Sequence, residues 1–342
     1  MAFAAMPNGM KKLVAHLEAL PHTKAGNALN TSVIPTLVSC VNDIAGALRS
    51  AQQVAAVGSS NAFGDEQLNV DVLAEKIIRS SIQGCPAIVT ASSEEDPVER
   101  PARETDTDQG LEAVQDEKYT IAFDPLDGSS IIAPNWTVGT IIGIWNGTSA
   151  LHADPTEKLV AAILGIYGPR TTAIVAIRVP GGEDACFEVG LAQDGNSVTC
   201  EIVRPRVQMA EGPFKIRYFA PANLRAAAED EKYFRLVSEF IRNKYTLRYS
   251  GGLVPDVVHA LVKGHGIYIS PVTAVSKAKL RRLYELTPIA LIMECAGAYA
   301  IDPAIGEKIL ARPVQDCDER AGLICGTKEE VALVKQSLDL SG

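Results

Sequence analysis

The sequence contains few aromatic residues, few histidines and no long uninterrupted apolar run. Phe, Trp and Tyr make up 6% of the 342 residues, and there are five His. No stretch of about 18 apolar residues indicates a membrane span, and the first thirty residues hold no apolar segment typical of a signal peptide. The chain ends Leu338-Asp-Leu-Ser-Gly342 rather than with a peroxisomal signal. We expect a cytoplasmic protein without a membrane partner; an organelle is the alternative if a targeting segment has been removed.

An excess of basic charge is also missing. The chain has 32 Lys and Arg against 41 Asp and Glu, a net charge of −9, and no basic block stands out. A nucleic-acid partner is therefore not expected.

The seven cysteines form no C-x-x-C pair and are scattered along the chain. This odd number and wide spacing indicate reduced, mostly buried thiols rather than a disulfide framework. The positions are Cys40, Cys85, Cys186, Cys200, Cys295, Cys317 and Cys325.

What the chain does have is enough apolar sequence for a large core, with 47% hydrophobic residues. Helical spacing from Ile34 to Leu48 follows two possible capping residues, Thr31 and Ser32, and a second helix begins near Asp71. A Gly- and Ser-rich loop is expected over 57–64, and a polar loop over 97–117. Short β-rich runs over 138–203 predict an antiparallel meander. Helices at 229–243, 255–263, 277–285 and 328–338, with strands near 266–270 and 298–301, predict a second, α/β half.

The most informative segment reads Ile-Ala-Phe-Asp-Pro-Leu-Asp-Gly-Ser-Ser over residues 121–130. Asp124 and Asp127 are hard oxygen ligands of the kind that Mg²⁺ takes together with phosphate oxygens. Pro125 is expected to end the strand, and Gly128 lets the chain turn so that its amides can face an anion. An ordinary strand-end turn is the alternative, because Asp, Pro and Gly are common turn residues.

Further acids occur at the ends of predicted elements. Glu94 and Glu95 follow an apolar run, Asp65 lies before the second helix, and Glu294 lies inside the apolar segment 288–297. A buried Glu294 would need a partner, and a cation is one. The alternatives are a solvated surface charge for each acid and, for Glu294, the polar stripe of an amphipathic helix.

These segments carry a family resemblance. The runs 93–96, 123–130, 138–145, 248–256, 279–285 and 293–297 resemble, in order and spacing, the sugar bisphosphatase family that contains fructose-1,6-bisphosphatase and sedoheptulose-1,7-bisphosphatase. The resemblance extends over roughly residues 31–335. Ile131, where fructose enzymes usually have Asn, and the run Phe219-Ala-Pro-Ala-Asn-Leu-Arg225 resemble the sedoheptulose branch.

The resemblance implies a layered α/β/α/β/α fold with two mixed sheets. We place the metal and 1-phosphate site in a domain of residues 1–208, and the sugar and distal-phosphate site in a domain of residues 209–342. The implied cofactor is Mg²⁺, two or more ions per site, with Mn²⁺ as an alternative. The implied ligands are Asp65, Glu94, Asp124, the Leu126 carbonyl, Asp127 and Glu294.

The resemblance also implies the other site residues. Asp71, together with Glu95, would activate the attacking water, and Gly128, Ser129 and Ser130 would bind the reacting phosphate. The remaining substrate contacts would come from Asn223, Arg225, Arg248, Tyr249, Lys279 and Arg281. A surface ion pair is the alternative for Arg225 and Arg248, and a half-buried strand aromatic for Tyr249.

The expected activity is Mg²⁺-dependent removal of the 1-phosphate of sedoheptulose 1,7-bisphosphate. A fructose-1,6-bisphosphatase, or an enzyme that accepts both sugars, is the second hypothesis, and a catalytically silent metabolite-binding relative is the third. A homodimer or higher homo-oligomer is expected, because the counterpart of Arg248 reaches across a subunit interface. Plastid members of the family carry a regulatory cysteine pair near the N-terminus, and no such close pair is found here.

Overall fold

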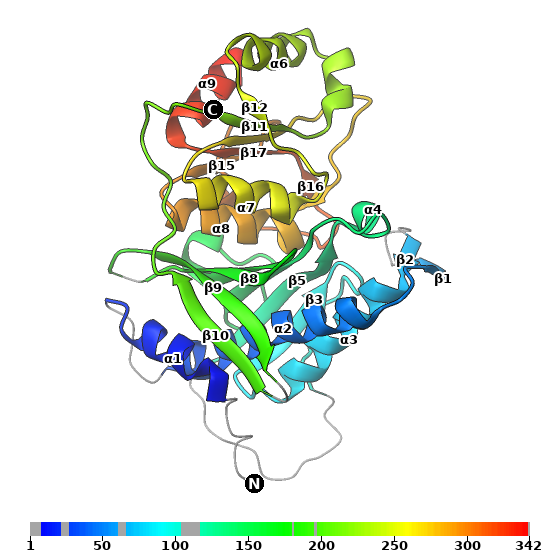
Figure 1. The fold of residues 1–342 in the computed structure, drawn as a ribbon, viewed down its shortest axis with the longest axis vertical. Coiled ribbons are helices and arrows are strands. Elements are labelled where there is room, and N and C mark those ends of the chain that lie inside the picture. The colour runs from blue at the N-terminus through cyan, green and yellow to red at the C-terminus, as the bar shows by residue number, and fades with distance from the viewer. Residues whose placement is uncertain are drawn as a thin grey trace.

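The chain folds into five layers in which helices alternate with two mixed β-sheets, as the computed structural model shows (Figure 1). The structure describes residues 8–21, 27–60, 66–103, 117–179, 181–194 and 197–340. The predicted α/β/α/β/α architecture is confirmed.

The larger sheet has eight strands in the order β10-β9-β8-β7-β6-β5-β3-β4. Its strands are β3 (Ile88–Ser93), β4 (Arg100–Pro101), β5 (Tyr119–Asp127), β6 (Val138–Asn146), β7 (Leu159–Tyr167), β8 (Thr171–Ile177), β9 (Ala185–Asp194) and β10 (Ser197–Arg204). Strands β6 to β10 form the predicted antiparallel meander. Strand β5 pairs antiparallel with β6 and parallel with β3, which makes the sheet mixed.

Helices at the N-terminal end cover the outer face of this sheet. They are η1 (Asn8–Met10), α1 (Lys11–Glu18), η2 (Leu29–Val33), α2 (Ile34–Ser50) and α3 (Asn69–Gln83). Helix α2 packs on β7 and β8, and α3 packs on β5. The continuous helical segment Leu29–Ser50 is long and apolar enough to cross a membrane, but it lies against the sheet with 56% of its most apolar window buried. Its apolar residues form part of the protein core.

The predicted cap of this helix is wrong. Thr31 and Ser32 lie inside the η2 turn, and the side chain of Asn27 accepts the amide of Asn30 at 2.8 Å. The apolar periodicity predicted the helix correctly, but the predicted start at Ile34 is about one turn too late. The helical segment begins at Leu29, and Leu29 and Val33 are also buried.

Two predicted loops contain short strands. The segment predicted as a loop over 57–64 contributes to β1 (Ala56–Ser60), which pairs with β2 (Glu66–Leu68). Strand β4 lies inside the polar segment 97–117. Residues 61–65 and 104–116 lie outside the described ranges.

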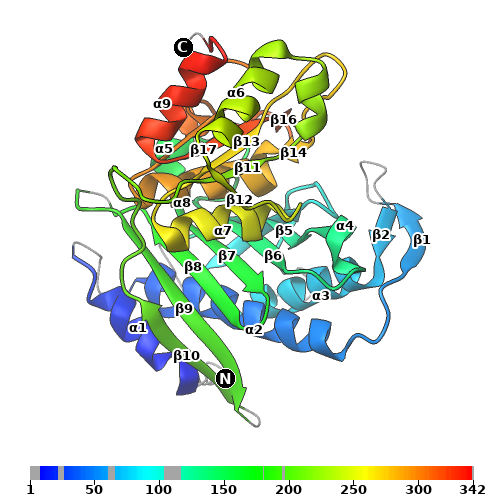
Figure 2. The ribbon, with the colours of Figure 1, turned by 45° about the horizontal axis from the view of Figure 1, so that its top comes forward.

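Helices α7 (Leu253–Lys263) and α8 (Thr287–Cys295) form the middle layer (Figure 2). Helix α8 contacts β7 and β8 below, and β15 and β17 above. The helix predicted over 277–285 is wrong. Residues 277–279 have no regular structure, and strand β14 (Leu280–Arg281) follows them. Only the π-helical turn η4 (Arg282–Leu286), which leads into α8, is helical in that segment.

The second sheet has five strands in the order β12-β11-β13-β17-β15. They are β11 (Tyr218–Pro221), β12 (Thr246–Leu247), β13 (Ile267–Ser270), β15 (Tyr299–Ile301) and β17 (Leu323–Gly326). Helices α6 (Glu231–Arg242) and α9 (Lys328–Ser337) cover its outer face. The smaller elements are α4 (Ser129–Ile132), α5 (Pro155–Lys158), η3 (Leu224–Ala228), η5 (Ile309–Ala311) and β16 (Arg320–Ala321).

All seven cysteines are free thiols, five of them buried and two half-buried. The predicted burial of most of the thiols is therefore confirmed. The division at residues 208 and 209 stays a prediction, since one apolar cluster joins residues from both sides of it.

Candidate active site

Two parallel strands bring acids from different parts of the chain together. Ser93, the last residue of β3, pairs with Phe123 of β5, and the Glu94 amide donates to the Phe123 carbonyl at 3.0 Å. The next residue on each strand is therefore an acid, Glu94 on one and Asp124 on the other.

The centre of the site is a group of three buried carboxylates. Oxygen atoms of Asp124, Asp127 and Glu285 all lie within 4.8 Å of one another. These side chains are 5%, 8% and 6% exposed. Three acids this close together and this deeply buried need a cation or protons between them. A set of ligands made only of oxygen atoms suits Mg²⁺ or Mn²⁺. The donor set therefore fits the divalent ion that the family resemblance implies.

Asp127 is held by the beginning of α7. Its Oδ1 accepts the Leu253 amide at 3.2 Å, and its Oδ2 accepts the Val254 amide at 2.7 Å. The positive end of a helix favours a carboxylate there. Pro125 does not end the strand as predicted: β5 continues to Asp127, with a shift in its pairing to β6 between Asp124 and Asp127. The Leu126 amide donates to Asp124 at 3.0 Å, and ligation by the Leu126 carbonyl stays a prediction.

Glu285 was not among the predicted ligands. It lies in η4, just before α8, and accepts the Arg281 amide. A signal was present in the sequence, because Glu285 is an acid inside the segment Leu283-Tyr-Glu285-Leu that is otherwise apolar or aromatic. Such an acid needs a partner once it is buried.

The structure places Glu294, which was predicted as a ligand, elsewhere. Its carboxylate pairs with Arg178 at 2.8 Å and with Lys308 at 3.3 Å. Glu294 lies near the C-terminal end of α8, whereas Glu285 precedes the start of that helix. Nine residues of helix rise by roughly 13 Å, so the two acids lie at opposite ends of the middle layer. The partner expected for a buried Glu294 is thus supplied by two basic side chains.

Burial raises the pKa of all three clustered carboxylates, and neighbouring negative charges raise it further. The pKa of Asp127 is raised to about 7, mainly by burial, with the Glu94 and Asp256 charges adding to it. Burial, followed by the Glu94 charge, raises the pKa of Asp124 and that of Glu285 well above their ordinary values. A bound cation would reverse these shifts by stabilising the ionised forms.

Asp71 lies at the start of α3, close enough to Glu94 and Glu95 to be affected by their charges. It is 3% exposed, and its Oδ2 accepts the Leu68 amide at 3.0 Å. Its Oδ1 makes no hydrogen bond within the described ranges. Burial first, and then the Glu95 and Glu94 charges, raise its pKa to about 7. An acid with a pKa near neutrality and an unused oxygen is suited to accept a proton.

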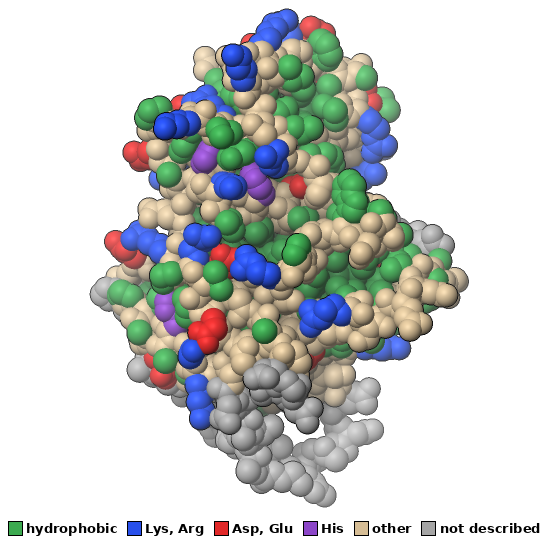
Figure 3. Space-filling model, viewed as in Figure 1, with side chains coloured by type: hydrophobic (Ala, Val, Ile, Leu, Met, Phe, Trp, Pro, Cys, Tyr) green, Lys and Arg blue, Asp and Glu red, His purple; other side chains and the backbone are tan. Residues whose placement is uncertain are grey.

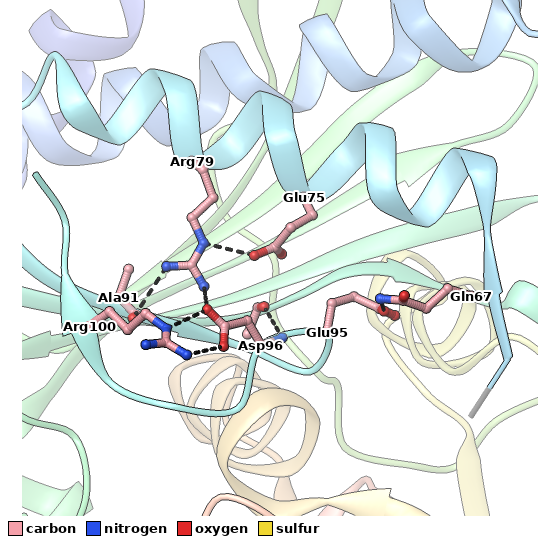
Figure 4. Close-up of polar contacts among 8 residues, drawn as sticks. Gln67, Glu75, Arg79, Ala91, Glu95, Asp96 and Arg100 are labelled. Atoms are coloured by element: carbon pink, nitrogen blue, oxygen red, sulfur yellow. Dashed lines mark hydrogen bonds and ion pairs between the residues drawn. The ribbon is translucent and has the colours of Figure 1, made fainter. Parts of the chain in front are cut away.

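The acids after β3 point in different directions. Figure 4 shows Glu95 directed toward Gln67, whose amide donates to it, while Asp96 is directed toward Arg79 and Arg100. Arg79 belongs to α3 and also pairs with Glu75 of the same helix at 2.7 Å, so its contact with Asp96 ties this segment to α3. Asp65, a predicted ligand, lies outside the described residues.

The predicted phosphate cradle follows directly after Asp127. Gly128 has φ +104°, a left-handed conformation that favours glycine, and a Cβ there would lie 3.0 Å from the Val138 side chain. Ser129 and Ser130 are exposed at the beginning of α4. The turn thus presents two hydroxyls and their amides next to the carboxylate group.

Among the predicted basic residues, Arg281 contacts an acid of this region. It is 3% exposed, and its guanidinium pairs with Glu94. Lys279, two residues earlier, is exposed. The structure brings Arg281 into the carboxylate site and leaves Lys279 at its surface.

The predicted distal-phosphate residues are divided between two places. Arg248 and Tyr249 line a cavity of about 1010 Å³ between α7 and the loops after α4 and β7. Basic and histidine side chains are visible on the face that displays α7 (Figure 3). Asn223 instead donates to the Pro271 carbonyl at 2.7 Å in the turn after β11, and Arg225 is exposed in that turn. The cavity also contains Arg170, His259 and Lys263.

This arrangement can bind a divalent cation, hold an anion beside it and accept a proton from water. These are the requirements for hydrolysis of a phosphate ester. The segment 248–256 joins the two parts of the site, because it begins in the cavity and ends on α7, whose first amides contact Asp127.

Comparison with known proteins agrees with this picture. Residues 15–191 match the model of the fructose-1,6-bisphosphatase N-terminal domain, and residues 213–339 match that of the C-terminal domain. A chloroplastic sedoheptulose-1,7-bisphosphatase from Triticum aestivum is 37% identical over 279 residues, 81% of this chain. The chain spans 65% of the length of that wheat relative. A class 1 fructose-1,6-bisphosphatase from Syntrophotalea carbinolica is 34% identical over 81% of this chain and 79% of its own.

Among solved structures, a crystal structure from Toxoplasma gondii, described as a candidate sedoheptulose-1,7 bisphosphatase, matches with a TM-score of 0.80. It is 32% identical, and the match covers 96% of this chain and 98% of that one. The chain belongs to the fructose-1,6-bisphosphatase family.

Proposed function

We propose that the protein is a metal-dependent phosphoric monoester hydrolase that removes the 1-phosphate of sedoheptulose 1,7-bisphosphate, giving sedoheptulose 7-phosphate and phosphate. The observation that carries this proposal is the group of three buried carboxylates, one of which, Asp127, directly precedes the turn at Gly128. A structural role would not require three clustered acids in the core, because burying their ionised forms together without a cation would destabilise the fold.

Asp124, Asp127 and Glu285 would hold the metal, with Glu94 beside them and the Leu126 carbonyl as a further ligand. Magnesium, when bound there, would supply positive charge to the phosphate oxygens and lower the pKa of a coordinated water. Asp71 would accept the proton of the attacking water, with Glu95 next to it. The turn Gly128–Ser130 would orient the reacting phosphate. Two or more Mg²⁺ ions are proposed per site, and Mn²⁺ is the alternative.

The second phosphate would bind in the cavity that Arg248 and Tyr249 line. Arg170 and Lys263 add positive charge there. The carboxylate of Asp256, which also lines the cavity, accepts hydrogen bonds from two backbone amides. A cavity of about 1010 Å³ has room for a seven-carbon sugar phosphate. Asn223, Arg225, Lys279 and Arg281 remain proposed substrate contacts.

Fructose 1,6-bisphosphate is the second candidate substrate, alone or together with the seven-carbon sugar. Relatives with either name match this chain. We also propose a homodimer, since Arg248 is exposed on the cavity rim and could serve a neighbouring site, and a cytoplasmic location. Relatives come from both chloroplasts and bacteria, so a fluorescent fusion in the source cell would test the location.

The direct test is phosphate release from the two sugar bisphosphates, side by side, with and without Mg²⁺. We expect Mg²⁺-dependent turnover and a higher kcat/KM for sedoheptulose 1,7-bisphosphate. A preference for the six-carbon sugar would favour the second candidate. If folded protein with Mg²⁺ hydrolyses neither sugar, the third hypothesis, a catalytically silent metabolite-binding relative, would be favoured.

Two glutamates provide a matched pair for the metal assignment. Glu285→Gln should raise the Mg²⁺ concentration needed for half-maximal activity, roughly tenfold to a hundredfold, because a ligand charge is lost. Glu294→Gln should leave this concentration unchanged, since its carboxylate faces Arg178 and Lys308. The opposite result would return Glu294 to the metal site.

A further inference from the structure

Asp256 is a buried acid whose partners are backbone amides rather than cations. It is 6% exposed. Its Oδ1 accepts the Ser250 amide at 2.7 Å, and its Oδ2 accepts the Gly251 amide at 3.2 Å. Within the described ranges no Lys or Arg forms an ion pair with it. Both of its carboxylate oxygens therefore form hydrogen bonds to the turn Ser250–Gly252.

This turn is tightly defined. Gly251 has φ +99°, and the Gly252 amide donates to the Ser250 hydroxyl at 3.2 Å. A Cβ on Gly252 would lie 2.9 Å from the Pro255 ring and 3.0 Å from the Ile131 side chain. The turn is thus packed between the first turn of α7 and the short helix α4 that follows the phosphate cradle.

The two residues after the turn contact the metal site. Leu253 and Val254 donate their amides to the two oxygens of Asp127, at 3.2 and 2.7 Å. The Val254 side chain lies against Gly139 of β6, where a Cβ would come within 2.5 Å of it. The first turn of α7 therefore has two carboxylates on it: Asp127 from the sheet, and Asp256 from the helix itself.

We propose that Asp256 is a positioning residue for the carboxylate site, holding the turn Ser250–Gly252 so that the first amides of α7 orient Asp127 toward the cation. This inference rests on the metal role proposed for Asp127. Outer partners that orient a ligand typically change metal affinity or activity by 10–100-fold when removed. The same turn begins next to Arg248 and Tyr249, so Asp256 would also set the wall of the sugar cavity.

A purely structural role would predict a different result. An acid near a helix N-terminus that accepts backbone amides can simply stabilise the helix. Asp230, the N-cap of α6, provides the comparison, because its Oδ1 accepts the Lys232 and Tyr233 amides at 2.8 and 3.4 Å. It begins α6, which lies in the outer layer above the second sheet.

The experiment is direct binding of Mn²⁺ to the full chain, measured by calorimetry without sugar phosphate, together with the melting temperature. Asp256→Asn removes one amide acceptor and the charge. We expect its Mn²⁺ affinity to fall by roughly tenfold or more, with kcat/KM for the sugar bisphosphate falling as well. Asp230→Asn should lower the melting temperature and leave Mn²⁺ affinity unchanged. Equal Mn²⁺ affinity for Asp256→Asn and the unaltered protein would overturn the proposal.

A pair of glycines keeps the test decisive if Asp256→Asn does not fold. Gly251→Ala strains the turn while Asp256 remains, and Gly264→Ala strains the other end of α7, where φ is +76°. We expect only Gly251→Ala to weaken Mn²⁺ binding, and equal affinities for both variants would contradict the inference. Unaltered protein that binds no Mn²⁺ would overturn it as well. Unaltered protein that binds Mn²⁺ but hydrolyses neither sugar would refute the proposed function alone.

Discussion

At the scale of single residues, what distinguishes this protein is the number of acids kept away from water. Asp71, Asp124, Asp127 and Glu285 are each less than one tenth exposed. Their pKa values are all raised by burial before any other cause. Asp71 differs from the other three, because it is outside the group whose oxygens lie within 4.8 Å of one another. This separation predicts a role in proton transfer rather than in metal binding.

Asp71→Asn is therefore expected to lower kcat by roughly 10²-fold or more, because an amide cannot accept the proton of water. Binding of Mn²⁺ should persist, since the three clustered carboxylates remain. Single-turnover phosphate release and calorimetry would measure the two effects. If both fell together, Asp71 would belong with the metal ligands.

At the scale of elements, close approach of α7 to β6 sets the distance between the helix and the carboxylates. Gly139 provides the space, since a Cβ there would come within 2.5 Å of the Val254 side chain. Only when the helix is this close can the Leu253 and Val254 amides reach Asp127. The active-site geometry thus depends on a packing contact between a strand and a helix that are distant in sequence.

Two glycine substitutions should have opposite effects on stability. Gly139→Ala is expected to cost about 1–3 kcal/mol of unfolding free energy, because the added methyl overlaps the Val254 side chain in a packed layer. Gly46→Ala should add about 0.5–1 kcal/mol, since Gly46 is inside α2 and nothing lies within 4 Å of its Cβ position. Urea denaturation would measure both. Equal changes would argue against the close packing of α7.

At the scale of the whole molecule, the eight-stranded sheet and the five-stranded sheet pack on opposite sides of one layer of helices. The eight-stranded sheet carries Asp124 and Asp127, while α7 and the η4 turn reach them from the middle layer. Both family models are needed to cover these residues. The carboxylate site is therefore complete only when the two halves are packed together.

Without metal, the protein should become less stable as pH rises. The pKa values of Asp71 and Asp127 are raised from 3.8 to about 7 in the folded state. Between these values the folded state binds more protons than the unfolded state, so the unfolding free energy falls with increasing pH. The melting temperature of chelator-treated protein should therefore be higher at about pH 6 than at about pH 8.

Magnesium should reverse this trend, because it binds the ionised carboxylates in competition with protons. The rise in melting temperature on addition of Mg²⁺ should be larger at about pH 8 than at about pH 6. Thermal melts at both pH values, with sodium chloride as the ionic-strength control, would check this. A Mg²⁺ effect independent of pH would mean that these acids do not bind the ion.

How much could be predicted depended on whether the signal was local. The strand that carries Asp124, the meander over 138–203 and the helix that begins near Asp71 followed from periodicity and turn residues alone, although the strand runs on past Pro125 to Asp127. The choice between Glu285 and Glu294 did not, because both are acids in apolar surroundings nine residues apart. Their difference arises only when α8 is placed against the sheet, with one end at Asp124 and the other at Arg178.

The sequence by itself determined the family, the chemistry of the acids and the order of the elements, since residue types, spacing and hydrophobic period are properties of the chain. Tertiary structure alone decided which acids share a cation, which amides reach Asp127 and where Arg248 lies. These depend on distances between segments more than one hundred residues apart, such as those of Asp127 and Leu253, whose residue numbers differ by 126. Such distances are set by how layers pack, and no local pattern encodes them.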